Sequence, residues 1–236
     1  MSESQPEQSL SGLQVPSAPS REETAADPQA TLQWISNCLA QIYSVPTPVT
    51  ADVKRTAYAN IYTVVWNYCV ITKDARTSRQ VTAVTARDLY TTLEQAIRGY
   101  CRKSLERIIG GNEANATTKV LNTYAQQWTA FVRLNSLVTH LFNPLEDRWI
   151  RREIDEAAAG PSKGQEAPHH IPELHTMVWR MEVLQASNKI SDAIVDMQHQ
   201  GQRSEDDQEA LDETLASLSK VGLVLSNGSL VASGQK

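Results

Sequence analysis

The sequence lacks the long apolar runs and basic stripes that mark membrane and nucleic-acid-binding proteins. A membrane-spanning helix needs about 18 or more consecutive apolar residues, and no such run occurs in the 236 residues. The formal net charge is −5, whereas nucleic-acid binding depends largely on basic side chains that neutralise phosphates. Neither a membrane nor a nucleic acid is therefore an expected partner.

Cysteine is scarce and widely spaced. Cys38, Cys69 and Cys101 are the three cysteines, and their spacing matches no zinc or redox motif. An odd number without close pairs favours a reducing compartment, where buried thiols act as small apolar groups. The start of the chain also lacks the basic and apolar segments of a secretory signal. We expect a cytoplasmic or nuclear protein, or one found in both compartments.

The patterns of catalytic and cofactor sites are also missing. Gly110-Gly111 is not followed by Lys and Ser or Thr, as a phosphate-binding loop requires. His169-His170 has no further metal ligands at a useful spacing. No serine or cysteine has recognisable partners for nucleophilic catalysis. We therefore predict no cofactor, no metal and no catalytic residue, and we do not expect an enzyme.

One charged cluster leaves two alternatives open. Four carboxylates cluster with three arginines, namely Asp147, Glu153, Asp155 and Glu156 with Arg148, Arg151 and Arg152. A pair of these carboxylates could serve acid–base catalysis. The alternative is a salt-bridged helix end whose arginine stems pack on neighbouring helices, and the lack of other catalytic patterns favours it.

Composition divides the chain into one ordered domain and two tails. Residues 1–26 are rich in Ser, Pro, Glu and Gln, which predicts a disordered tail. Asp27-Pro28 should begin the first helix, because Asp caps helices well and Pro fits the first helical position. Residues 27–225 are predicted to form a single helical domain. The Gly- and Ser-rich residues 226–236 are predicted to be a flexible tail.

The ordered part has the apolar spacing of helices. A strand is the alternative for 52–71, which is rich in β-branched and aromatic residues, but its length and its i, i+3, i+4 pattern favour a helix. The fold class is therefore all-α, a bundle of about five long helices and a short last one, with no strand pair. The predicted helices cover 28–44, 52–71, 85–110, 115–154 with an interruption at Pro144, 172–199, and 209–221.

Aromatic residues recur at helical spacing. Each of the five tryptophans falls in a separate helical segment, which predicts that they join the segments into one core, each burying on the order of 200 Å². Tyr58 and Tyr62 are one helical turn apart, and they are either core residues or a pair that faces a partner. The tryptophans are Trp34, Trp66, Trp128, Trp149 and Trp179.

Several motifs together resemble the first, amino-terminal repeat of the cullin family. The stretch from Val120 to Glu156 resembles the cullin signature, most specifically in the sequences YAQQW at 124–128 and RWIRRE at 148–153. Asn67-Tyr68-Cys69 is similar to the second helix of the cullin that serves F-box proteins. The sequence NKISDAI at 188–194 is similar to the closing helix of that repeat.

The resemblance implies a helical bundle of the cullin-repeat type and a non-catalytic role. In the family this repeat lies at the tip of a scaffold and docks a Skp-type adaptor that carries an F-box protein, within an SCF-type ubiquitin ligase. The family's RING subunit binds a carboxy-terminal domain that these residues do not contain, so it is not an expected partner. By position, the adaptor-binding residues are Tyr58, Ala59, Tyr62, Trp66, Asn143, Pro144 and Arg148.

Two positions depart from the family pattern. The branch that uses Skp-type adaptors usually has methionine at the position of Ala59 and tyrosine at that of Pro144. Loss of an apolar anchor from the centre of an interface can cost about 2 kcal/mol or more, and proline inside a helix bends its axis. One alternative is therefore a truncated or degenerate cullin-like protein that binds no adaptor. Another is an unrelated helical enzyme or regulator.

Overall fold

The computed structural model describes residues 16–44, 55–77, 84–110, 116–160, 167–200, 204–226 and 228–233. These residues are mostly helical, which confirms the all-α fold class, and none of their helices is long and apolar enough to cross a membrane. The elements are α1 (Arg21–Ala26), α2 (Pro28–Ile42), α3 (Arg55–Thr77), α4 (Ala86–Ile109), α5 (Ala116–Leu141), α6 (Asn143–Leu145), the π-helical turn η1 (Glu146–Ile150), α7 (Arg151–Ala159), α8 (Ile171–Trp179), the π-helical turn η2 (Arg180–Leu184), α9 (Lys189–His199), α10 (Glu205–Lys220), β1 (Leu223–Ser226) and β2 (Ser229–Ala232).

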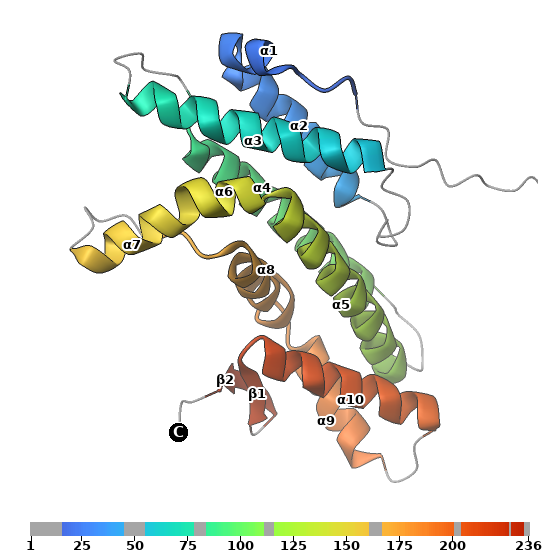
Figure 1. Ribbon diagram of the computed structural model, residues 1–236. Coiled ribbons are helices and arrows are strands. Elements are labelled where there is room, and N and C mark those ends of the chain that lie inside the picture. Colours follow the sequence, from blue (N-terminus) through green and yellow to red (C-terminus); the bar gives the residue numbers. More distant parts are fainter. Residues whose placement is uncertain are drawn as a thin grey trace, which may run out of the picture.

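The helices stack into an elongated body (Figure 1). At one end α1, α2 and α3 pack together, and at the other α9, α10 and the two strands form a second group. The long helices α4 and α5 connect these ends: α4 contacts α2 and α8, and α5 contacts α9 and α10. The two ends of the molecule therefore present separate surfaces.

Local capping fixes two helix boundaries where the sequence predicts them. The Asp27 carboxylate accepts the Ala30 backbone N–H at 2.9 Å, and Pro28 begins α2. The Thr85 backbone N–H donates to Asp88 at 2.6 Å, and α4 ends before Gly110. These signals depend only on neighbours three or four residues away, which is why sequence alone locates them.

The predicted disorder through residue 26 is wrong for Arg21–Ala26, which form α1. Ser20 and Glu23 make a reciprocal capping box there: the Glu23 N–H donates to Ser20 Oγ at 3.1 Å, and the Ser20 N–H donates to Glu23 Oε2 at 2.7 Å. Thr24 is fully buried. The turn is stable because a cap and a packing contact compensate for the polar composition. The first 15 residues of the predicted tail lie outside the described residues.

Two predicted helices have different boundaries. The segment 172–199 is not one helix, since η2 ends at Leu184 and α9 begins at Lys189. The last helix begins earlier than predicted, because Ser204 caps it and its Oγ accepts the Asp207 N–H at 3.2 Å. The acidic residues 205–207 suit the positive end of the helix dipole, although their composition suggested a loop.

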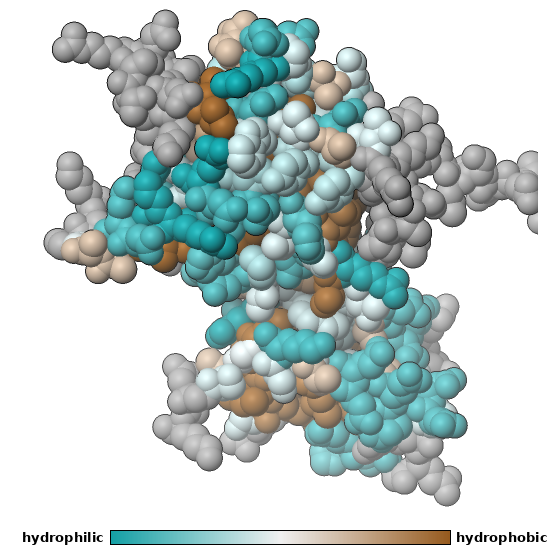
Figure 2. All heavy atoms as spheres, viewed as in Figure 1, coloured by the Kyte–Doolittle hydropathy of each residue, from teal (hydrophilic) through white to brown (hydrophobic). Residues whose placement is uncertain are grey.

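The prediction that the chain has no strand pair is wrong. β1 and β2 pair antiparallel, with Leu223 opposite Ala232 and Ser226 opposite Ser229. Asn227-Gly228 is a strong hairpin signal in the sequence, and Gly228 has φ +76°, which favours glycine. Leu225 and Leu230 pack against the helical core, so the predicted tail from residue 226 contributes to the fold. Figure 2 shows apolar surface over this hairpin.

The core contains an aromatic cluster between α5 and α8. Trp179 is fully buried, and its ring centroid lies 4.5 Å from that of Phe131 and 5.5 Å from that of Trp128. The Trp179 indole N–H donates to the Tyr124 hydroxyl at 3.4 Å, and that hydroxyl lies 2.7 Å from Ser217 Oγ on α10. The cluster therefore joins three helices through both apolar and polar contacts.

The three cysteines are free and buried, in agreement with their prediction as small apolar groups. Burial raises the pKa of Cys38 to about 12 and that of Cys69 to about 12. Burial also raises the pKa of Cys101 well above its ordinary value. Since the thiolate is the reactive form, these thiols act as packing groups.

Candidate interaction surface

Helix α3 has a buried face and an aromatic face. Ile61, Val65 and Tyr68 are at most 1% exposed and pack into the core. Tyr58, Tyr62 and Trp66 follow each other at intervals of four residues, and residues so spaced are neighbours on a helix surface. The two tyrosines are half-buried, whereas Trp66 is 41% exposed.

The prediction that Trp66 belongs to the core is wrong. Trp66 directly follows Val65, and successive helical residues lie about 100° apart around the axis. Val65 points into the core and is 0% exposed, and Trp66 therefore lies at its edge. Trp149 and Trp179 are buried as predicted, while Trp34 and Trp128 are only partly buried.

The second predicted contact region lies beside α3. Figure 1 shows α6 directly next to α3, and both α6 and η1 contact that helix. The Arg148 guanidinium carbon lies 4.0 Å from the centroid of the Trp66 ring, a cation–π contact. We call Tyr58, Ala59, Tyr62, Trp66, Asn143 and Arg148 the aromatic face. The structure thus joins two segments about 80 residues apart in sequence.

Pro144 does not bend a continuous helix, contrary to the expectation for proline in a helix interior. α5 ends at Leu141, Phe142 forms a turn, and Pro144 lies in the first turn of α6, where its missing N–H costs nothing. Pro144 is buried, while its neighbour Asn143 is exposed and donates through Nδ2 to Asp147 at 2.8 Å. Asn143 is therefore accessible at the surface, whereas Pro144 is not.

Electrostatics leave the aromatic face with hydrogen-bond donors. Burial and, second, the neighbouring Tyr62 raise the pKa of Tyr58, so its hydroxyl stays protonated at neutral pH. Arg148 Nε is buried and has no hydrogen-bond partner among the described residues. A carboxylate or carbonyl group of a partner would accept from the Tyr58 hydroxyl, whereas Arg148 Nε lies below the surface.

Ion pairs hold the segment behind the aromatic face. Arg151 lies 3.1 Å from Asp147, and Arg152 lies 3.1 Å from Glu153. These ion pairs are those expected of a salt-bridged helix end. Glu146 is buried, accepts the Ile171 backbone N–H at 3.1 Å and pairs with His170. These contacts fix η1, and with it the position of Arg148.

Among the described residues, the cavity that Arg148 lines is smaller than most small-molecule sites. This cavity has a volume of about 190 Å³, below the roughly 300–1,000 Å³ that ligand sites usually have. Among the described residues, no group of three or more His, Cys, Asp or Glu side chains is arranged to hold a metal ion.

Comparison with known proteins identifies the class of this helical protein. The family model described as the cullin alpha solenoid domain matches residues 32–227. Cullin-1 of Dictyostelium discoideum is 21% identical over 147 residues, covering 59% of this chain and 18% of the relative. Cullin-1 of Caenorhabditis elegans is 26% identical over 167 residues, covering 63% of this chain and 19% of the relative.

The chain belongs to the cullin family. This result confirms the resemblance stated above, and the relatives agree with a repeat of the cullin-1 type. The chain spans about a fifth of the length of these relatives, 18% and 19%. The roles of the aromatic-face residues and of Pro144 remain predictions.

Proposed function

We propose that this chain is a non-catalytic binding module whose aromatic face docks a Skp-type adaptor carrying an F-box protein. Through this contact it would take part in the assembly or regulation of a ubiquitin ligase. The observation that carries the proposal is the row of aromatic residues on α3, half-buried at Tyr58 and Tyr62 and exposed at Trp66, which Arg148 continues over the Trp66 ring. The similarity of the chain to cullin-1 proteins supports the choice of a Skp-type adaptor as the partner.

The composition of the aromatic face supports a protein partner. Trp, Tyr and Arg are the residues most enriched among those that dominate binding energy. The surface over α3 in Figure 2 is mostly pale, the colour of intermediate hydropathy. Such a surface tolerates water when free and excludes it when covered.

The rigidity of α3 also supports docking. Its opposite side is buried through Ile61, Val65 and Tyr68, and Tyr58 and Tyr62 pack partly against the core. Side chains held in this way lose little conformational entropy when a partner binds. More of the contact energy therefore contributes to affinity.

A second candidate is a folded cullin-like protein that binds no adaptor. The observations that favour it are that Ala59 exposes only a methyl group at the middle of the face, and that Pro144 is buried and offers no side chain to a partner. The interface would then lack apolar anchors at two positions. Its helical fold and family membership would be unchanged.

Truncating Tyr62 tests the proposed face. We expect Tyr62→Ala to weaken adaptor binding by about 2 kcal/mol, or roughly thirtyfold, because it removes a central aromatic contact. Titration calorimetry with the adaptor and F-box protein measures the change. Met181→Ala is the control, since Met181 is 45% exposed but lies in η2, away from α3. Wild-type affinity in Tyr62→Ala would remove this face from the proposal.

A restoring variant distinguishes the two candidates. If the wild-type chain does not bind, Ala59→Met adds an apolar side chain at an exposed position of α3 without disturbing the core. Adaptor binding by Ala59→Met would support the second candidate, and would show that the wild-type chain fails to bind because it lacks an apolar side chain at position 59. Absence of binding in both proteins would leave adaptor docking without support.

A further inference from the structure

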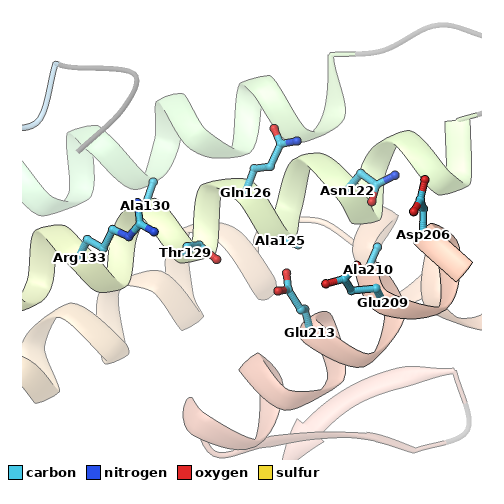
Figure 3. Close-up of a pocket in the computed structure, with 10 residues that line it drawn as sticks. All are labelled: Asn122, Ala125, Gln126, Thr129, Ala130, Arg133, Asp206, Glu209, Ala210 and Glu213. Carbon is cyan, nitrogen blue, oxygen red and sulfur yellow. The ribbon is translucent and has the colours of Figure 1, made fainter. Parts of the chain in front are cut away.

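A groove between α5 and α10 lies at the end of the molecule away from the aromatic face. Its cavity has a volume of about 490 Å³, with Asn122, Thr129 and Arg133 on α5 and Glu209 and Glu213 on α10 among the lining residues. Figure 3 shows the carboxylates of Glu209 and Glu213 extending from α10 toward α5. We call this feature the α5–α10 groove.

The groove continues into a second cavity of about 260 Å³. The two cavities share Thr129, Arg133 and Glu213, and the second one reaches Trp128 and Val132. The α5 segment from Asn122 to Val132 is about 15 Å long at 1.5 Å per residue. This length accommodates about three turns of a helix lying along the groove.

The negative charge of the chain is concentrated on one side of this groove. α10 carries six carboxylates and one lysine, a net charge of −5. This value equals the formal net charge of the whole chain, so the acidic and basic residues outside α10 balance. Figure 2 shows hydrophilic surface over the amino-terminal half of α10.

Three of these carboxylates line the groove in a row. Asp206, Glu209 and Glu213 lie three and four residues apart along α10, so they face the same side. Within the described part of the chain none of them forms a salt bridge. Like charges at this spacing destabilise a helix, and cations from a partner would relieve that repulsion.

Apolar side chains accompany the acidic row. Val132 is 42% exposed, Trp128 is half-buried, and both line the second cavity. Ala125, Ala130 and Ala210 line the first cavity with small side chains, which leaves room for larger side chains of a partner. Within the described residues the three carboxylates are not arranged to hold a metal ion. An apolar strip beside an acidic row matches a segment that is basic on one side and apolar on the other.

We propose that the α5–α10 groove binds a basic amphipathic helical segment of a partner protein. Lysine or arginine side chains of that segment face Glu209 and Glu213, and an apolar side chain packs against Val132 and Trp128. Complementary charge sets the orientation and speeds association, while apolar burial adds affinity. This site is independent of adaptor docking, because the aromatic face is at the other end of the molecule (Figure 1).

The test uses a short, fluorescein-labelled helical peptide of lysine and leucine with an amphipathic pattern. Fluorescence anisotropy measures its affinity for the full chain, and amide chemical shifts locate its site. We expect shifts along α5 and α10 near Thr129 and Glu213. The same peptide with glutamate in place of lysine should not bind, and a scrambled pattern should bind more weakly. Equal binding of all three peptides, or shifts elsewhere, would overturn the proposal.

Matched charge variants separate the groove from general attraction to an acidic protein. Glu209→Gln with Glu213→Gln should weaken peptide binding by about tenfold, as expected from the loss of two close charge contacts. Glu205→Gln with Asp212→Asn removes the same charge from exposed positions of α10 outside the groove, and should change the affinity by less than about twofold. Equal weakening by both pairs would contradict a defined groove.

The apolar half of the site has its own variant. Val132→Ser keeps the charge and the helix but removes the exposed apolar side chain. We expect Val132→Ser to lower the affinity for the peptide by about threefold to tenfold, in line with the loss of a partly buried aliphatic contact. Unchanged affinity in this variant would contradict the assigned apolar contact. Circular dichroism spectra that match wild type establish that each variant is folded.

Discussion

Trp179→Ala should lower the free energy of unfolding by about 3–5 kcal/mol, the usual cost of deleting a buried tryptophan. Trp179 is 0% exposed and packs against Phe131 and Trp128. The deletion also leaves the Tyr124 hydroxyl without the indole donor. Because typical domains are stable by only about 5–15 kcal/mol, the variant should be partly unfolded at modest denaturant. Urea titration followed by circular dichroism measures the loss.

The same substitution at Trp66 is the matched control. Trp66 is 41% exposed, and its main specific contact is the Arg148 guanidinium. An exposed cation–π contact contributes about 0.5–1 kcal/mol, so Trp66→Ala should cost far less than Trp179→Ala. Trp179→Phe keeps an aromatic ring, so it should lower the free energy of unfolding by less than Trp179→Ala. Equal losses at Trp179 and Trp66 would contradict the assignment of core and surface.

Acid should destabilise the protein between pH 6.5 and about 4 through His175. His175 is fully buried, and burial lowers its pKa to about 4, although the hydrogen bond to Ile171 opposes this shift. The unfolded chain binds a proton at the ordinary pKa of about 6.5. The contribution of neutral His175 to the free energy of unfolding is therefore fully present above pH 6.5 and falls as the pH drops toward 4. The loss is about 3 kcal/mol at 1.36 kcal/mol per pKa unit.

The hydrogen bonds of His175 define the variants for this test. Nδ1 lies 2.8 Å from the Ile171 carbonyl oxygen, which only accepts, so Nδ1 carries the proton. Nε2 then accepts from the Tyr43 hydroxyl at 2.8 Å, and burial holds the Tyr43 pKa well above its ordinary value. His175→Gln should flatten the dependence of unfolding free energy on pH. Tyr43→Phe should cost about 1–3 kcal/mol and keep the dependence. A steep dependence that persists in His175→Gln would contradict this role.

The sequence predicts features of the fold that depend on local contacts. The starts of α2 and α4 follow from Asp27-Pro28 and Thr85, whose caps involve residues three positions away. The break between α5 and α6 follows from Pro144. Periodicity also finds the long helices, because each buries a stripe of apolar residues. The fold class could therefore be predicted without knowledge of the packing.

Features that depend on tertiary contacts were missed. α1 has a polar composition, and its contacts with α2 and α3 and the burial of Thr24 show that it belongs to the body. The hairpin of β1 and β2 is short, and its Leu225 and Leu230 are stabilised by helices elsewhere in the chain. Isolated two-stranded hairpins are marginal in water, so the turn signal of Asn227-Gly228 alone did not establish that the two strands form.

The candidate site was predicted in part. The resemblance to cullins supplied its seven positions, but the periodicity of α3 alone could not decide which side of the helix faces outward. Aromatic residues occur on both sides, with Tyr68 buried and Trp66 exposed. The contact between Arg148 and Trp66 joins distant segments and emerges only in the folded chain. The α5–α10 groove was missed, although six carboxylates in one helix were visible in the sequence.

Titration calorimetry of the purified chain with a Skp-type adaptor bound to an F-box protein tests the proposed docking most directly. The adaptor should come from the same organism as this chain, and the mixture should also be run on a size-exclusion column. The proposed function predicts a one-to-one complex with a micromolar or tighter Kd and co-elution of the components. An absence of heat and of co-elution at high micromolar concentrations would contradict it, and would leave a cullin-family domain whose aromatic face serves no such adaptor.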